Sequence, residues 1–216
     1  MVPVVLAGCS GPLSTLDPAG AAAREIAWLW WAMLSGAAVL TALVLVLLAM
    51  GFGPPRKLRP RRWTHGLGLG LSAGVLIPLL GAGLWVGERV LPRDDGALSV
   101  QVRAVQWHWE FTQPGPDGPL VTRDVVVIPA GQPVDFEITS ADVIHAFWVP
   151  QLGGKMDAVP GRTNRLRLQA DEPGLLHGQC AEFCGLGHAA MRFEVLVVPP
   201  ESFEEALAEA AGGTDD

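Results

Sequence analysis

Two long stretches without a charged residue stand out in the first 91 residues, at 26–50 and at 66–87. Each exceeds the roughly 20 residues that an α-helix needs to cross a ~30 Å hydrocarbon layer. The second stretch contains several glycines and Pro78, which weaken a helix in water but are tolerated in lipid. Both are therefore predicted to be membrane spans; buried core helices are the weaker alternative at these lengths.

The loop between the two stretches is basic. It carries five cations and no acidic residue, at Arg56, Lys57, Arg59, Arg61 and Arg62. Positively charged loops remain on the cytoplasmic side of a membrane. This loop, taken as 51–65, is predicted to be cytoplasmic, so both ends of the chain face outward.

Beyond Leu91 the pattern changes to short β-type runs separated by proline and glycine. Residues 98–105 alternate between apolar and polar positions, and 107–111 continue the alternation. Several short strands at this spacing predict a β-sandwich or a small barrel. Four more runs fit the pattern: 124–128, 134–138, 165–168 and 192–198. A short helix with a possible capping box is expected from Ser202 to Ala211.

Charge divides the chain at the same place as hydropathy. The whole chain has a net charge of −7 and a mean hydropathy of +0.32. Residues 1–91 hold seven Lys or Arg and three Asp or Glu, which leaves a formal charge of −11 for residues 92–216. An acidic surface does not suit nucleic acid. It suits a basic protein partner, although acidity that only keeps the domain soluble is the simpler explanation.

Twelve residues near the C-terminus concentrate candidate metal ligands. They contain Cys180, Cys184, His188 and Met191, and His145 lies 35 positions before the first cysteine. Soft sulfur ligands combined with imidazole favour copper. A structural zinc site usually contains no methionine, and a disulfide would leave the histidines and the methionine unexplained.

The remaining cysteine has a different context. Residues 5–10, which end in Gly8-Cys9-Ser10, resemble a bacterial lipoprotein signal, in which Cys9 is lipidated after cleavage before it. The apolar stretch is short and no cation precedes it. An unmodified N-terminal cysteine is the alternative. If Cys9 is lipidated, residues 1–8 are absent from the mature protein.

Three segments, 140–157, 160–164 and 178–185, resemble subunit II of haem–copper cytochrome c oxidases. With the two spans, the resemblance covers most of residues 24–200. It implies a transmembrane helical hairpin followed by an all-β, cupredoxin-like Greek-key sandwich. The expected division is an N-terminal segment 1–23, a hairpin 24–91, an outer domain 92–200 and a tail 201–216.

In this family the matching residues hold a dinuclear copper centre called CuA. The resemblance implies that Cys180 and Cys184 bridge the two coppers and that His145 and His188 are terminal ligands. Met191 would be a weak ligand, and Glu182 would bind through its backbone carbonyl. The Glu182 side chain would help to bind magnesium at the contact with subunit I. Trp107 would receive the electron from the donor.

The function implied by the resemblance is that of subunit II of a terminal cytochrome c oxidase in a bacterial inner membrane, with the outer domain periplasmic. It would accept electrons from a c-type cytochrome and pass them to the haems of subunit I, where oxygen is reduced to water. A membrane-tethered copper carrier, a quinol oxidase subunit II and the CuA domain of nitrous oxide reductase are the alternatives. Asp135, Asp142 and Asp157 are candidate cytochrome contacts, with ordinary solvated carboxylates the simpler interpretation.

Two departures from the family's pattern stand out. The chain contains no tyrosine, although the aromatic segment around Trp107 usually carries some. Trp63-Thr64 is present, but the acidic residue that often precedes this pair is absent from the segment. The sequence therefore leaves open whether this subunit takes up protons.

Overall fold

The computed structural model describes residues 9–54, 59–93 and 95–213. Part of the basic loop, at Arg56 and Lys57, and the apolar part of the signal-like segment lie outside the described residues. The chain divides into two units: one comprises residues 26–89, and the other comprises the described residues before and after them.

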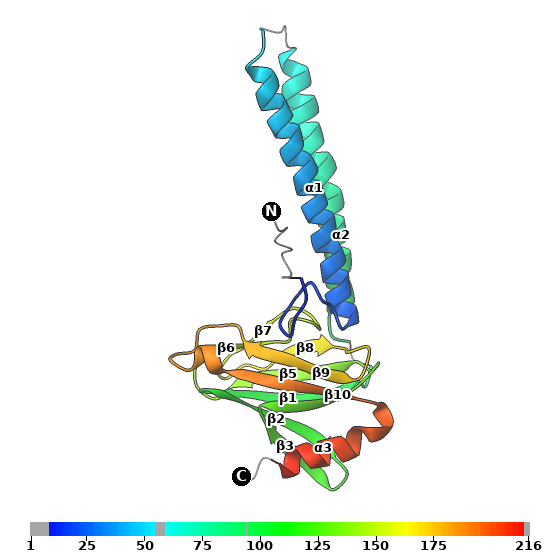
Figure 1. Ribbon diagram of the computed structural model, residues 1–216, viewed down its shortest axis with the longest axis vertical. Helices are drawn as coiled ribbons and strands as arrows, with labels where there is room; N and C mark the ends of the chain where they lie inside the picture. The colour runs from blue at the N-terminus through cyan, green and yellow to red at the C-terminus, as the bar shows by residue number, and fades with distance from the viewer. Residues whose placement is uncertain (1–8, 55–58, 94, 214–216) are drawn as a thin grey trace, which may run out of the picture. The chain divides into compact units, whose positions relative to one another are not determined.

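The first unit consists of helices that lie side by side (Figure 1). Helix α1 covers Ala21–Gly51, the π-helical segment η1 covers Arg62–Leu71, and α2 continues it over Ser72–Val90. The two helical segments are long and apolar enough to cross a membrane, with mean hydropathies of 2.5 and 1.9. Pro78 lies inside α2. The two apolar helices predicted from the sequence are thus confirmed as helices.

The second unit is a sandwich of two five-stranded sheets followed by a short helix. Its elements are β1 (Leu98–Val105), β2 (His108–Gly115), β3 (Gly118–Arg123), β4 (Val125–Pro129), β5 (Val134–Ser140), β6 (His145–Trp148), β7 (Met156–Ala158), β8 (Asn164–Leu168), β9 (Gly174–Cys180), β10 (Arg192–Val198) and α3 (Phe203–Gly212). Short 3₁₀ turns, η2 (His188–Ala190) and η3 (Pro200–Ser202), precede β10 and α3.

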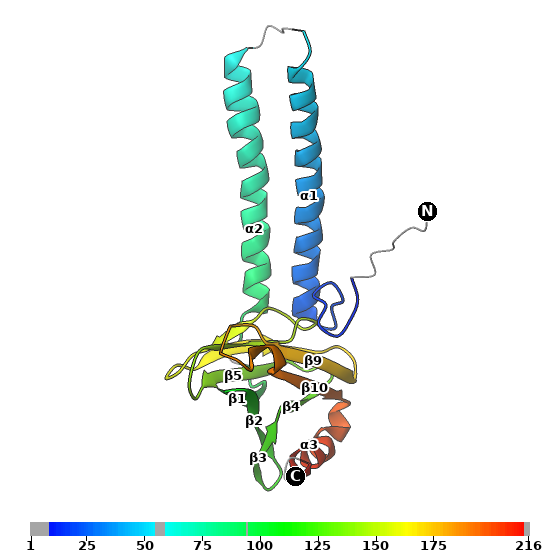
Figure 2. The ribbon, with the colours of Figure 1, turned by 60° about the vertical axis from the view of Figure 1, so that its left-hand side comes forward.

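The order of the strands is β3-β2-β1-β5-β8 in one sheet and β4-β10-β9-β6-β7 in the other. Strand β1 runs parallel to β5 and β10 parallel to β4; the other neighbours are antiparallel. These crossovers between non-consecutive strands distinguish the fold from a simple meander. Figure 2 shows α3 beside the ends of β3 and β4.

Alternate side chains of the strands fill the space between the sheets, as the period of two requires. In β1, for example, Val100, Val102 and Ala104 are fully buried while their neighbours are not. An aromatic cluster lies at the centre, where the rings of Phe147 and Phe193 stack with centroids 4.8 Å apart. Both rings belong to the same sheet, and Trp109 of the other sheet contacts each of them edge-on, with centroids 5.6 and 5.5 Å away. These edge-to-face contacts join the two sheets across the core.

The sequence located most of these strands, and the structure corrects the rest. The bounds of β1 and β10 are as predicted, whereas β3, β6 and β7 were missed. Trp107 does not continue β1; it lies in the turn before β2. The prediction of a capping box is wrong, because Ser202 makes no side-chain capping bond to α3 within the described chain.

The segment before α1 belongs structurally to the sandwich. The amide of Ala19 donates to the carbonyl of Gln151 at 2.8 Å, and the amide of Asp171 donates to the carbonyl of Ala19 at 3.0 Å. Gly20 lies directly against the backbone of Gln169, where a Cβ would collide with the carbonyl oxygen. Arg24 pairs with the Asp171 carboxylate. No pattern in the sequence indicated this attachment.

One glycine in β9 should be essential to the packing next to the cysteines. Gly178 lies opposite Phe193 of β10, and a Cβ at this position would overlap the Phe193 ring. We expect Gly178→Ala to lower the free energy of unfolding of the sandwich by roughly 1–3 kcal/mol, because the ring must leave its position in the core.

Chemical denaturation of the metal-free protein measures this change. Gly174→Ala is the matched control, since Gly174 begins the same strand and a methyl group there would have no neighbouring atom within 4 Å. Equal unfolding free energies for the two variants would contradict the prediction.

Candidate metal centre

The two cysteines lie at the base of a loop that β9 and β10 hold closed. Cys180 is the last residue of β9, and its amide donates to the carbonyl of Met191 at 2.9 Å. The amide of Met191 in turn donates to the carbonyl of Gly187 at 3.1 Å. These backbone bonds fold the segment between Cys180 and Met191 back on itself, so its sulfur atoms point to one place.

The sulfur atoms are close together but not bonded. The Sγ atoms of Cys180 and Cys184 are 3.8 Å apart, and both thiols are free and buried. A disulfide would need about 2.05 Å. The Sδ atom of Met191 lies 3.7 Å from Cys184 Sγ, and the carbonyl oxygen of Glu182 lies 3.2 Å from Cys180 Sγ.

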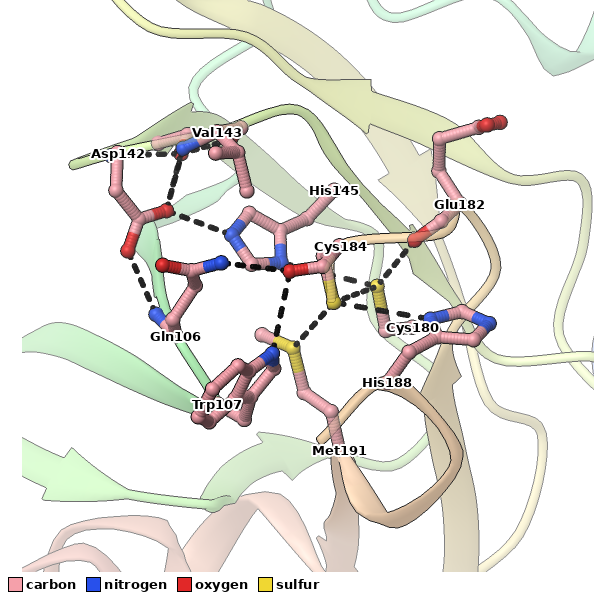
Figure 3. A network of polar contacts seen from close by, with 11 residues as sticks. Gln106, Trp107, Asp142, Val143, His145, Cys180, Glu182, Cys184, His188 and Met191 are labelled. Carbon is pink, nitrogen blue, oxygen red and sulfur yellow. Dashed lines mark hydrogen bonds and ion pairs between the residues drawn. The ribbon is translucent and has the colours of Figure 1, made fainter. Parts of the chain in front are cut away.

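Two imidazoles complete the cluster (Figure 3). His145 begins β6, which pairs with β9, and its Nδ1 lies 3.8 Å from Cys180 Sγ. His188 begins η2, and its Nδ1 lies 3.7 Å from Cys184 Sγ. The two rings lie on opposite sides of the pair of sulfurs. The ligand atoms of His145 and both cysteines all lie within 4.8 Å of one another.

Asp142 determines which nitrogen of His145 faces the sulfurs. Its Oδ1 lies 2.8 Å from His145 Nε2, and it also accepts from the amide of Val143 at 2.6 Å. Burial raises the pKa of Asp142, but the hydrogen bonds from His145 and from backbone amides outweigh it, so the pKa lies below its usual value. A carboxylate on Nε2 leaves Nδ1 free as a metal ligand.

Trp107 packs against the loop that carries the two cysteines. Its Nε1 donates to the carbonyl of Cys184 at 3.2 Å, and 42% of the side chain is exposed. A Cβ at Gly187 would overlap the Trp107 ring, so the glycine permits the close approach. The structure therefore places Trp107 between solvent and the cluster.

The remaining sequence candidates have different surroundings. The Glu182 carboxylate is half exposed, points away from the sulfurs and lies 3.8 Å from Lys155 Nζ. Cys9 is exposed. Asp157 is also exposed, 4.0 Å from Lys155. Asp135 is not a surface acid available to a cytochrome: it is buried and pairs with Arg165 and Arg167 at 3.0 and 2.8 Å.

Sequence reasoning missed two residues of the centre, Asp142 as an orienting group and Gln106 as a contact of the loop. Asp142 was considered only as a surface acid. Its position three residues before His145 was a usable signal, because a short turn can bring such a pair together. Gln106 carried no such signal, since its partner Cys184 is 78 residues away.

The donor set suits copper. It combines two thiols, two imidazoles, a thioether and a carbonyl, all directed into a buried site. Soft sulfur ligands select copper or zinc over hard cations, and a thioether favours copper. The carboxylate-rich surroundings that magnesium or calcium require are absent from this cluster of described residues.

In the metal-free protein, Cys184 should hold its proton tightly. Burial, together with the neighbouring Cys180, raises the pKa of Cys184 to about 12. A raised thiol pKa keeps Cys184 neutral at pH 8, with a thiolate fraction of roughly one in ten thousand. We expect its alkylation by iodoacetamide to be slow at pH 8 and to accelerate about tenfold per pH unit up to pH 10.

Peptide mass spectrometry of the metal-free protein follows this reaction. The same protein unfolded in denaturant is the control for reagent quality, because unfolding removes the burial of Cys184. Labelling of Cys184 at pH 8 at the same rate in the folded and the unfolded protein would show that the loop does not bury the thiol.

Comparison with known proteins agrees with this site. Residues 99–198 match the family described as "Cytochrome C oxidase subunit II, periplasmic domain". Cytochrome c oxidase subunit 2 of Alkalihalophilus pseudofirmus is 32% identical over 220 residues, covering 92% of this chain and 63% of that protein. The subunit 2 of Cereibacter sphaeroides is 30% identical over 238 residues, covering 89% of this chain and 78% of that protein.

A solved structure matches the sandwich. The crystal structure of the periplasmic domain of subunit II of cytochrome oxidase (CoxB) of Bradyrhizobium japonicum superposes with a TM-score of 0.51 and 30% sequence identity. The match covers 57% of this chain and 98% of that domain. The expected cupredoxin-like sandwich is confirmed, and the chain belongs to the cytochrome c oxidase subunit II family.

Proposed function

We propose that the chain is the electron-accepting subunit of a terminal cytochrome c oxidase. It takes electrons from a c-type cytochrome at a dinuclear CuA centre and passes them to the haems of subunit I, where oxygen is reduced to water. One observation carries the proposal: six soft or neutral donor atoms from two segments converge in one buried site.

The number and placement of the donors favour two metal ions over one. A single tetrahedral ion would use four ligands and leave two of the six unused. The two imidazoles contact different sulfurs and lie on opposite sides of the sulfur pair. This arrangement supports two thiolates shared between two ions, with His145 on one and His188 on the other.

The surrounding residues suit a centre that only carries electrons. Copper, when bound, supplies a reversible one-electron couple. His145 is completely buried and Met191 nearly so, which excludes water from the ligands. The short backbone bonds across the loop hold the donors in place. A site in which every donor is fixed changes little in geometry with redox state.

Trp107 is the proposed point at which electrons arrive. It is the partly exposed aromatic side chain that hydrogen bonds to the loop of the cysteines. The formal charge of −11 on residues 92–216 would attract a basic cytochrome over long distances. These two features support a c-type cytochrome as the donor.

The metal loop also carries features that fit a contact with subunit I. Phe183 and Leu186 are 75% and 98% exposed, which is unusual for large apolar side chains next to a buried site. We assign the half-exposed carboxylate of Glu182 as one ligand of a magnesium ion at this contact. The other ligands would come from subunit I.

Placement in the bacterial inner membrane, with the sandwich on the periplasmic side, is part of the proposal. It rests on the two apolar helices and on the cations between them, of which Arg59, Arg61 and Arg62 lie in the described chain. The proposed domains are the hairpin 24–91 and the outer domain 92–200.

The alternatives fit the site less well. A copper carrier needs ligands that exchange readily, whereas four of these donor residues are buried: His145, Cys180, Cys184 and Met191. A quinol oxidase subunit has no need of the donor set that this loop presents. The CuA domain of nitrous oxide reductase would not need the two apolar helices.

Copper loading of the full chain in detergent tests the proposal. We expect two coppers per chain, a purple colour and near-infrared absorption from a mixed-valence pair, together with rapid oxidation of reduced cytochrome c. Cys180→Ser removes a shared thiolate and should abolish all of these signals. Binding of one copper or of zinc in well-folded protein would overturn the assignment, and binding of two coppers without oxidation of the cytochrome would favour a carrier.

A second proposal concerns the exposed Cys9, which we assign as a lipid attachment site. The intact mass of the mature chain tests this, because lipidation removes residues 1–8 and adds acyl chains. Cys9→Ala should restore an unmodified mass. A wild-type mass that matches the unprocessed chain would rule the assignment out.

A further inference from the structure

The turn between β1 and β2 joins the two segments that supply the metal ligands. It consists of Gln106 and Trp107, and it lies between the residues around His145 and the loop of the cysteines (Figure 3). Gln106 contacts both of these segments, the first through its backbone amide and the second through its side-chain amide. Each contact is a hydrogen bond of normal length, so the residue forms a bridge of defined geometry.

The first contact leads to His145. The backbone amide of Gln106 donates to Asp142 Oδ2 at 2.7 Å, while Oδ1 of the same carboxylate holds His145 Nε2 at 2.8 Å. The orientation of Asp142 therefore depends on the turn as well as on its own segment. This bond uses only the backbone of residue 106, so it survives a change of side chain.

The second contact leads to Cys184. The side-chain Nε2 of Gln106 donates to the carbonyl oxygen of Cys184 at 2.7 Å, and Trp107 Nε1 donates to the same oxygen at 3.2 Å. Gly185, with a φ of +118°, allows the approach, since a Cβ there would lie 3.2 Å from both side chains. The shorter bond, from Gln106, is the stronger of the two.

We propose that Gln106 is a positioning residue of the metal centre, which fixes the Cys184 side of the site relative to His145 and raises the reduction potential of the bound copper. This inference rests on the proposed function. The Cys184 carbonyl belongs to a proposed metal ligand, and donors on its oxygen withdraw part of the negative charge of that residue. Less negative charge near the metals disfavours the oxidised state.

A role limited to the turn itself makes a different prediction. If Gln106 only shaped the turn, its backbone bond to Asp142 would suffice and the side chain could be replaced without effect on the metal. The side-chain amide lies part-buried against the loop, however, and its partner is the backbone of a cysteine. Removing the side-chain amide therefore distinguishes a role in shaping the turn from a role in positioning the metal site.

Gln106→Met in the full copper-loaded chain in detergent tests the proposal. Methionine has a similar length and no N–H donor, so it removes the bond to Cys184 and retains the bond to Asp142. We expect copper to be lost to a chelator about tenfold faster, in the range typical for groups that orient metal ligands. The reduction potential should fall, as measured by optical titration of the near-infrared band.

Gln101→Met is the matched control. Gln101 is exposed on β1, five residues earlier, and the same substitution there should change neither quantity. Thermal unfolding of the metal-free proteins shows whether each variant folds. If Gln106→Met is unstable, Gln106→Glu provides the second variant: it retains the size of the side chain, places an acceptor against the Cys184 carbonyl, and should lower the potential further than methionine does.

The outcomes separate this inference from the proposed function. If the wild type binds two coppers and the variants at 106 match Gln101→Met in copper loss and potential, Gln106 has no positioning role and the function stands. If the potential falls and copper loss accelerates, the inference holds. If the wild type binds no copper pair, the proposed function fails and the role of Gln106 fails with it.

Discussion

The loop between β9 and β10 holds two buried thiols 3.8 Å apart, and the rest of the site is arranged around that pair. Burial makes a pair of thiolates costly, as the raised pKa of Cys184 shows. A metal cation removes this cost, since it replaces the protons and neutralises the charge. The closed loop therefore stabilises the metal-bound form more than the metal-free form.

The sandwich supports this arrangement through strand pairing. Strand β6 pairs with β9 so that Phe147 lies opposite Cys180, which brings His145 to the sulfurs. Strand β10 pairs with the other side of β9 and closes the loop at Met191. The aromatic cluster beneath, with Phe147 stacked on Phe193, keeps the three strands from shifting. A shift of one residue would turn Cys180 away from the site.

Hydrogen bonds connect the site to its surface. Asp142 orients His145, Gln106 joins Asp142 to the Cys184 carbonyl, and Trp107 binds the same carbonyl while remaining exposed. The proposed electron route from solvent to the copper ligands therefore follows a chain of direct contacts. The same contacts make the centre rigid, which an electron carrier needs because geometric rearrangement slows each transfer.

The sequence alone determined the elements whose signal is local. Uncharged runs predicted the two apolar helices and alternation predicted β1 and β10. The grouping of sulfur and imidazole side chains indicated the candidate metal ligands. Short strands such as β7 could not be predicted from the sequence, and neither could the hydrogen bonds of Gln106, because both depend on partners distant in the chain. Only the tertiary structure showed that Asp142 hydrogen bonds to His145 and that Asp135 forms ion pairs with arginines. It also showed that residues 19–24 pack against the sandwich. Those contacts depend on which backbone and side-chain groups the fold brings together, and a local sequence pattern does not specify contacts between distant segments.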